Sequence, residues 1–297
     1  MSRRRALTRA CRVGSFGHWR RRRCLDPAPV AETSPVALLR AYPAWPPAPG
    51  PGWTPPQLDE PLEIPLVESS LAALTARGFT IRAGKGLGEG NRILLDARTP
   101  KQRLVLDLSR AKGCTILLGR HARLAGEVSA GGRGHLLAAT GWDSPSVAMV
   151  HCTMRGERAL ITLGHGLTSN RTNMLAEGPE GAVLVGDDAM FATGITLRTS
   201  DSHAIIDLGS RRQVNVPRPV VIGPHVWIGQ EALVMKGVTV GAGSIVAGRA
   251  VVTRPVPPRA LAAGVPARII RENVSWSRLG RPRPEQIDAM IAALPEG

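Results

Sequence analysis

Residues 221–246 read VIGPHVWIGQEALVMKGVTVGAGSIV, and an aliphatic residue returns in this stretch at every sixth position. The frame continues past it without a slip, through Ile222, Ile228, Val234, Val240, Val246 and Val252. Glycine often follows the aliphatic residue, and the fifth position of each hexad is small or β-branched. A period of six fits neither an α-helix nor an alternating strand. It predicts triangular coils of about 18 residues, in which one aliphatic side chain per side points inward and each coil stacks on the next as a solenoid.

Shorter runs of the same period precede this stretch and are offset from one another by single residues. They are Leu118, Leu124, Ala130 and Leu136; then Ile161, Leu167 and Asn173; then Val185, Phe191 and Leu197, a frame that reaches His203. The repeat stops after this histidine and resumes at Val221. The sequence therefore predicts an all-β parallel solenoid over 115–272, with a protruding loop near 204–220.

The flanks of the repeat have other compositions. Residues 1–64 are basic and then proline-rich, with twelve prolines in 27–66, and we expect this segment to be largely disordered. Residues 65–114 are predicted to hold one short amphipathic helix, 65–78, closed by Gly78, and lead-in strands. A tail with a short helix is expected over 273–297.

The formal net charge of +15 is concentrated at the start of the chain, since residues 1–25 hold nine arginines and no acidic residue. This pattern predicts either a solvated basic tail, or a start site assigned too far upstream, or an anchor for an anionic membrane or polymer. Binding to nucleic acid would rest on charge alone, since stacking aromatic residues do not accompany it. The tail lacks the apolar region of a secretory signal, and no window approaches the length of a membrane span.

The four cysteines, at positions 11, 24, 114 and 152, have no metal-ligand spacing. They favour reduced thiols in a cytoplasmic protein.

Two longer stretches carry a resemblance to a known family. Residues 222–273, IGPHVWIGQEALVMKGVTVGAGSIVAGRAVVTRPVPPRALAAGVPARIIREN, resemble the C-terminal half of hexapeptide-repeat acyltransferases, which fold as a left-handed parallel β-helix. Residues 198–229, RTSDSHAIIDLGSRRQVNVPRPVVIGPHVWIG, are similar to bacterial capsular and exopolysaccharide O-acetyltransferases, and more distantly to galactoside and maltose O-acetyltransferases. The resemblance is specific over 185–276, weaker over 115–184, and does not reach residues 1–80. It implies acetyl-CoA as acyl donor and a homotrimer with active sites between neighbouring β-helices.

The resemblance also assigns roles around the loop. His203, in TSDSH, matches the general base that removes the proton of a sugar hydroxyl. Imidazole suits this exchange because it titrates near neutral pH, and general base catalysis typically contributes about 10²–10⁴-fold. Asp201 is expected either to orient the ring or to cap the loop. Ser202 and Asn173 are the expected acceptor-binding residues.

For CoA, the resemblance implies a set of matched positions in the last coils: Trp227, Gly229, Gly248, Thr253, Arg254, Arg268 and Arg271. Guanidinium groups suit its phosphates, although Trp227 is also interpretable as an anchoring ring at a coil corner. Arg249 departs from the family pattern, in which a small residue is usual, and either adds a phosphate contact or crowds the cofactor channel.

A metal site is not expected. Trimeric carbonic anhydrases of the same architecture bind zinc through three histidines, two of them close together in the sequence. Here the nearest histidines after residue 100 are fourteen positions apart. His225 is best interpreted as a turn residue.

The predicted function is an acetyl-CoA-dependent O-acetyltransferase acting on a sugar or a bacterial polysaccharide. The alternative is an inactive β-helix scaffold that binds a membrane or an anionic polymer through its arginine-rich tail. The sequence leaves open the acceptor, O- against N-acetylation, and acetyl against longer acyl donors.

Overall fold

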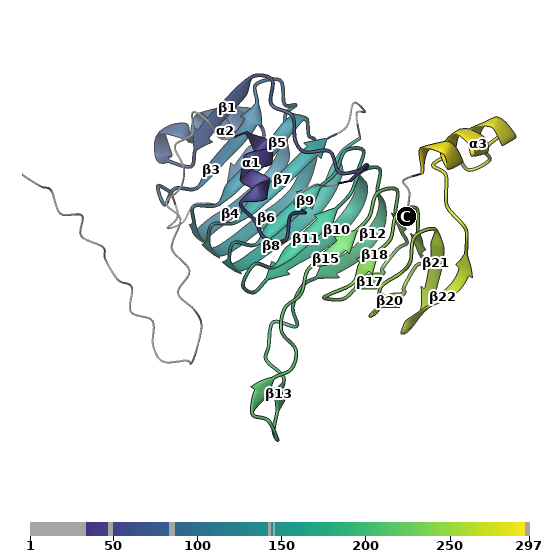
Figure 1. The fold of residues 1–297 in the computed structure, drawn as a ribbon. Coiled ribbons are helices and arrows are strands. Elements are labelled where there is room, and N and C mark those ends of the chain that lie inside the picture. Colours follow the sequence, from purple (N-terminus) through teal and green to yellow (C-terminus); the bar gives the residue numbers. More distant parts are fainter. Residues whose placement is uncertain (1–33, 47–49, 83–86, 142–143, 145, 295–297) are drawn as a thin grey trace, which may run out of the picture.

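The computed structural model describes residues 34–46, 50–82, 87–141, 144 and 146–294. Stacked coils form two largely parallel sheets, as Figure 1 shows. Sheet A consists, in spatial order, of β1 (Pro61–Pro65), β3 (Arg92–Asp96), β5 (Thr115–His121), β7 (Leu136–Gly141), β9 (Leu160–Leu163), β11 (Ala182–Val185), β15 (Val220–Ile222) and β18 (Thr239–Val240). Sheet B consists of β2 (Phe79–Ile81), β4 (Arg103–Lys112), β6 (Leu124–Arg133), β8 (Ala148–Glu157), β10 (Thr168–Glu177), β12 (Met190–Arg198), β16 (Trp227–Ile228), β19 (Ile245–Val246), β21 (Ala260–Gly264) and β22 (Ala267–Glu272), with β17 (Leu233–Val234) and β20 (Val251–Val252) beside it. The predicted all-β solenoid is confirmed.

The last coils have the predicted period of 18. Strand partners in register are Val221 with Thr239, Trp227 with Ile245, and Leu233 with Val251. All six aliphatic residues of the repeat frame are at most 1% exposed. Each fully buried side chain of this size contributes about 1.5–3 kcal/mol through burial of apolar surface. The repeat is therefore the core of these coils.

The earlier coils are longer than the hexad frame predicts. Strand partners there lie 21 to 25 residues apart, as in Phe79 with Leu104, Ile116 with Leu137, and Leu137 with Ile161. The long strand β12 forms two sides of its coil, since its first part pairs with β16 and its last part with β17. In the next coil these two sides are separate strands joined by a corner. The upstream frame was consequently wrong at Asn173, because its neighbours Thr172 and Met174 are fully buried and Asn173 faces outward.

A strap formed by residues 34–46 and 50–60 covers the outer face of sheet A. Its helix α1 (Pro35–Arg40) places Leu39 and the following Trp45 against Leu117 and Leu184. The Asp187 carboxylate accepts hydrogen bonds from the backbone N–H of Thr54, at 3.0 Å, and from its hydroxyl. The sequence predicted a largely disordered segment up to residue 64; the described part of it instead packs against the sheet, because the outward side of sheet A is apolar. Residues 1–33, which include the whole of the predicted basic tail, lie outside the described residues.

The other helices are short. The predicted helix before Gly78 appears as the 3₁₀ turn η2 (Glu68–Ser70) followed by α2 (Leu71–Ala76), with Leu74 buried. The C-terminal helix α3 (Pro284–Ala293) is also present as predicted. None of the helices in the described ranges is long and apolar enough to cross a membrane.

Candidate active site

His203 lies at the start of the loop that interrupts the repeat. The chain leaves sheet B at the end of β12, forms a small antiparallel hairpin of β13 (Ile206–Asp207) and β14 (Arg212–Gln213), and returns at β15. Figure 1 shows this hairpin projecting away from the solenoid. His203 is exposed, and its backbone carbonyl accepts a hydrogen bond of 2.8 Å from Asn215 Nδ2. The predicted protruding loop is confirmed, and it presents an imidazole to solvent.

Ser202 is held by a buried carboxylate that was not among the candidate residues of the sequence analysis. It adopts a left-handed conformation with φ of +64°, and its hydroxyl donates to Glu177 Oε2 at 2.5 Å. Glu177, at the end of β10, is 4% exposed and also accepts from Arg155 Nη1 at 3.0 Å. A single glutamate ahead of a glycine carries no sequence signal, so only the fold reveals this contact.

Asp201 bonds to the neck of the loop. Its Oδ2 accepts from Asn215 Nδ2 at 2.8 Å and from Lys236 Nζ. The ammonium group of Lys236 and then the amide of Asn215 lower the pKa of this carboxyl, against a smaller opposing effect of burial. Among the described residues, no recorded contact joins the Asp201 carboxylate to the His203 ring. Its role in orienting that ring stays a prediction.

Asn173 lies on the outer face of sheet B, in the middle of β10. It is in register with His151 of β8 and with Thr196 of β12. The three side chains are partly exposed and form one polar row across neighbouring coils. This row is open to a ligand, and the acceptor-binding role of Asn173 stays a prediction.

The cofactor candidates occupy the last coils. Trp227, on β16, is 37% exposed. It is in register with Ile245 of β19, and Ile245 is in register with Leu261 of β21. Leu261 in turn lies opposite Arg271 of β22. Trp227 and Arg271 thus share a row three strand spacings long, roughly 14 Å at ~4.8 Å per strand. An aromatic face and a guanidinium group at this separation suit a long, phosphate-bearing ligand.

Gly229 and Gly248 stack at one corner. A Cβ on Gly229 would lie 2.5 Å from the backbone nitrogen of Gly248, so side chains are excluded there by backbone contact. Gly248 itself is exposed, which leaves its peptide accessible. Thr253, Arg254 and Arg268 are exposed as well, and one Arg268 N–H donates to the carbonyl of Ala267 at 3.0 Å.

Arg249 has a partner that the sequence did not indicate. Its Nε donates to Glu231 Oε2 at 2.8 Å across neighbouring coils, and both residues have left-handed backbone with φ near +58°. The guanidinium group lowers the pKa of the Glu231 carboxyl. Because the Arg249 side chain is 82% exposed, this ion pair contributes little to stability. Its guanidinium remains accessible from solvent.

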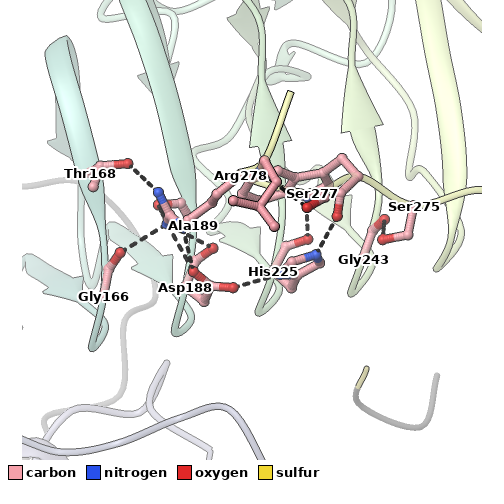
Figure 2. A network of polar contacts seen from close by, with 11 residues as sticks. Gly166, Thr168, Asp188, Ala189, His225, Gly243, Ser275, Ser277 and Arg278 are labelled. Carbon is pink, nitrogen blue, oxygen red and sulfur yellow. Dashed lines mark hydrogen bonds and ion pairs between the residues drawn. The ribbon is translucent and has the colours of Figure 1, made fainter. Parts of the chain in front are cut away.

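Four residues, Asp188, His225, Trp276 and Arg278, form a clasp that fastens the C-terminal segment beside Trp227. Figure 2 shows Asp188, His225 and Arg278 of this clasp. His225 stacks on Trp276 with ring centroids 4.4 Å apart, and its Nδ1 lies 2.6 Å from Asp188 Oδ2. Arg278 donates to Asp188 Oδ1 at 2.8 Å and to the hydroxyl of Thr168 at 2.9 Å. The ring centroids of Trp227 and Trp276 are 6.3 Å apart. The predicted turn role of His225 agrees with its φ of +51°, but the residue also anchors the chain end.

Within one chain, the structure brings His203 together with Ser202, Asp201, Asn215 and Glu177, and it gathers the cofactor candidates separately in the last coils. No recorded contact between described residues joins the two groups. The described residues also contain no group of three or more His, Cys, Asp and Glu side chains placed to hold a metal ion. The loop can supply a base, and the coils can supply an aromatic and cationic surface.

Comparisons with known proteins agree with the repeat. Residues 219–254 match the family described as bacterial transferase hexapeptide (six repeats). The chain is similar to the polysialic acid O-acetyltransferase of Escherichia coli O1:K1 / APEC, with 37% identity over 123 residues that cover 41% of this chain and 37% of that protein. It is also similar to the galactoside O-acetyltransferase of Escherichia coli (strain K12), with 36% identity over 90 residues that cover 30% of this chain and 44% of that protein. The chain thus matches less than half the length of either relative.

Among solved structures, the crystal structure of the polySia specific acetyltransferase NeuO aligns with a TM-score of 0.43 and 24% identity, over 72% of this chain and 98% of that chain. The family match agrees with the resemblance predicted from residues 185–276: residues 219–254 match bacterial transferase hexapeptide repeats and lie in a parallel β-solenoid.

Proposed function

We propose that the protein transfers an acetyl group from acetyl-CoA to a hydroxyl of a sugar or polysaccharide, with His203 as general base. The observation that carries this proposal is the exposed imidazole at the point where the hexapeptide repeat is interrupted, on a backbone held by Asn215 and by the Ser202–Glu177 contact. Two relatives that carry O-acetyltransferase names support the same class of reaction.

In this mechanism the donor supplies a thioester carbonyl, and the chain supplies positioning and proton transfer. The His203 ring accepts the proton of the attacking hydroxyl as its oxygen bonds to the thioester carbonyl carbon; the C–S bond then breaks, and the proton passes from the imidazolium to the departing CoA thiolate. Asn173 and Ser202 are proposed to orient the acceptor. The accessible peptide at Gly248 is the kind of donor that stabilises negative charge developing on a carbonyl oxygen.

The last coils fit CoA by the chemistry of their side chains. Arg254, Arg268 and Arg271 present exposed guanidinium groups for phosphates, and the exposed ring of Trp227 offers a stacking face. Thr253 and Arg249, both exposed, complete the proposed binding surface, and the buried Gly229 is proposed to keep the backbone close to Gly248. No metal is required by this scheme.

The test is an acetyl-transfer assay over a panel of sugars and bacterial polysaccharides, read by mass spectrometry, with wild type and His203→Ala. We expect His203→Ala to reduce kcat by about 10²–10⁴-fold while the Kd for CoA, measured by isothermal titration, changes little. Turnover near the wild-type value in a folded variant would remove His203 from the mechanism.

The second candidate is an inactive scaffold that binds a membrane or an anionic polymer through residues 1–25, where nine arginines gather. The two proposed functions predict different results for CoA, which the enzyme should bind and the scaffold should not. Binding of CoA that is lost in an Arg268→Ala, Arg271→Ala double variant supports the enzyme, whereas absence of CoA binding by the wild type supports the scaffold.

We further propose a homotrimer, since the His203 loop and the cofactor candidates are separate within one chain and a neighbouring copy can bring them together. Cys114 and Cys152 are free and buried, which suits a reducing compartment. We therefore place the reaction in the cytoplasm.

A further inference from the structure

We propose that Asn215 is the positioning residue of His203, and that Asp201 and Lys236 act on the imidazole only through it. This inference rests on the proposed function, because it concerns the same base. Of the two roles expected for Asp201, orienting the ring or capping the loop, it favours an indirect action through the neck of the loop. The neck is the place where the outgoing chain, residues 201–205, meets the returning chain at residue 215.

All four hydrogen-bonding positions of the Asn215 amide are in use. Its Oδ1 accepts from the backbone N–H of Ile205 at 2.7 Å and from Gln213 Nε2 at 3.2 Å. Its Nδ2 donates to Asp201 Oδ2 and to the carbonyl of His203, each at 2.8 Å. Because donors gather at one end and acceptors at the other, only an amide satisfies every partner. Asn215 is 7% exposed, so the bonds are shielded from water.

The partners of these hydrogen bonds lie on both sides of His203 in the chain. They fix the peptide oxygen of His203 itself, and they hold the side chain of Asp201 two residues earlier and the N–H of Ile205 two residues later. The hydrogen bond from Val214 N–H to the carbonyl of Ile205, at 2.9 Å, closes the neck on the hairpin side. The backbone of His203 is thereby held while its side chain stays exposed.

Lys236 connects the neck to the solenoid. It follows β17, and its ammonium group contacts the Asp201 carboxylate that also binds Asn215. The Lys236 and Asp201 side chains are only 19% and 24% exposed, so this ion pair is screened less than a surface pair. Lys236 thus sets the position of Asp201 relative to the last coils, Asp201 orients Asn215, and Asn215 holds the backbone of His203. Misplacing a reacting group by about 1 Å can cost about 10²-fold in rate.

The decisive variant is Asn215→Asp, which keeps the shape of the side chain but replaces the donating end with a second carboxylate oxygen beside Asp201. We expect kcat for acetyl transfer to fall about 10²-fold, while the Kd for CoA stays within about twofold because the cofactor candidates are elsewhere. Hydrogen exchange of backbone amides in 201–216, followed by mass spectrometry, should become faster. Asn170→Asp is the matched control, since it makes the same chemical change at an exposed position of β10, and it should leave both measurements unchanged.

Lys236→Met provides a second test that leaves the Asn215 amide in place. It should lower kcat less than Asn215→Asp, and the double variant should be no slower than Asn215→Asp alone, since both act along one path. If Asn215→Asp does not fold, the comparison of Lys236→Met with wild type decides: unchanged kcat and unchanged exchange would overturn the inference.

Two results with Asn215→Asp would also overturn it: exchange that stays as slow as in wild type, or kcat within about threefold of wild type despite faster exchange. A wild-type chain that binds CoA but acetylates no acceptor is a different result. It contradicts the proposed function and with it any catalytic role of the neck, while the exchange measurement still decides whether Asn215 holds the backbone of His203.

Discussion

At the scale of single residues, Gly126 shows how closely adjacent coils approach. It lies in β6 with φ of +114°, and a Cβ built there would come within 2.1 Å of the carbonyl oxygen of Val150 in the next coil. That oxygen belongs to the backbone of β8 and cannot turn aside as a flexible side chain can. The same strand contains Gly131, whose Cβ would meet only Arg110 Cβ at 3.5 Å, an ordinary contact.

We therefore expect Gly126→Ala to destabilise the protein by at least about 2 kcal/mol, since it combines backbone strain of about 1–3 kcal/mol with a clash against main chain. For a domain of this size the melting temperature should fall by roughly 5 °C or more. Gly131→Ala should change stability by less than about 1 kcal/mol. Differential scanning calorimetry of the two variants measures this, and equal melting temperatures would show that the coils can separate locally.

At the scale of elements, the C-terminal segment is attached to the solenoid by the clasp around Asp188. Burial alone would raise the pKa of this carboxyl, but hydrogen bonds from His225 and Arg278 together outweigh burial and lower it. A carboxyl whose pKa is lowered in the folded state stabilises that state when it is ionised. Its contribution is complete well above the ordinary value of 3.8 and is lost as the pH falls through the lower pKa of the folded protein.

We expect Asp188→Asn to be less stable than wild type at pH 7, and this difference to shrink as the pH falls below about 4, where the unfolded wild type takes up its proton. Free energies of unfolding from urea titrations between pH 7 and pH 2.5 give the difference directly. Asp288→Asn is the control, because Asp288 is an exposed residue of α3. A difference that is the same at every pH would show that the charge of Asp188 does not hold the clasp.

At the scale of the whole molecule, the hairpin loop carries an unusual amount of exposed apolar surface. Leu208 is 87% exposed at its tip, and four further aliphatic residues of the loop are 46–58% exposed: Ile205, Ile206, Val214 and Val216. Exposed apolar surface concentrated in one segment is typical of a contact surface. In a ring of three copies joined by head-to-tail contacts, each copy would bury the apolar surface of its loop against a neighbour.

We accordingly expect sedimentation equilibrium at micromolar concentration to give the mass of a trimer. Leu208→Ser should shift the equilibrium toward monomer, because it removes the most exposed apolar side chain of the loop. Leu279→Ser, which changes a half-exposed leucine outside the loop, should not. A wild-type chain that is monomeric at this concentration would contradict the shared-site arrangement.

The last coils could be predicted from the sequence because their information is local. One aliphatic residue in six faces the interior of a coil, so the positions from Ile222 to Val252 reveal both the period and the core without knowledge of any distant contact. The interruption after His203 was visible for the same reason. The helix before Gly78 and the family resemblance also depend on short, contiguous patterns.

Other features depended on contacts between residues far apart in the chain. The repeat frame that ended at Asn173 was wrong at that position, because Asn170 and Arg171 are both exposed before Thr172 turns inward, and this break in the alternation leaves no mark on a hydrophobic pattern. The partners of Asp201 come from positions 215 and 236, and the carboxylate beneath Ser202 comes from position 177. The stacking of coils brings these residues together. The sequence by itself determined the repeat and the place where a site interrupts it, whereas only the tertiary structure decided which side chains hold the histidine, since hydrogen-bond partners across coils are set by the register of the stack.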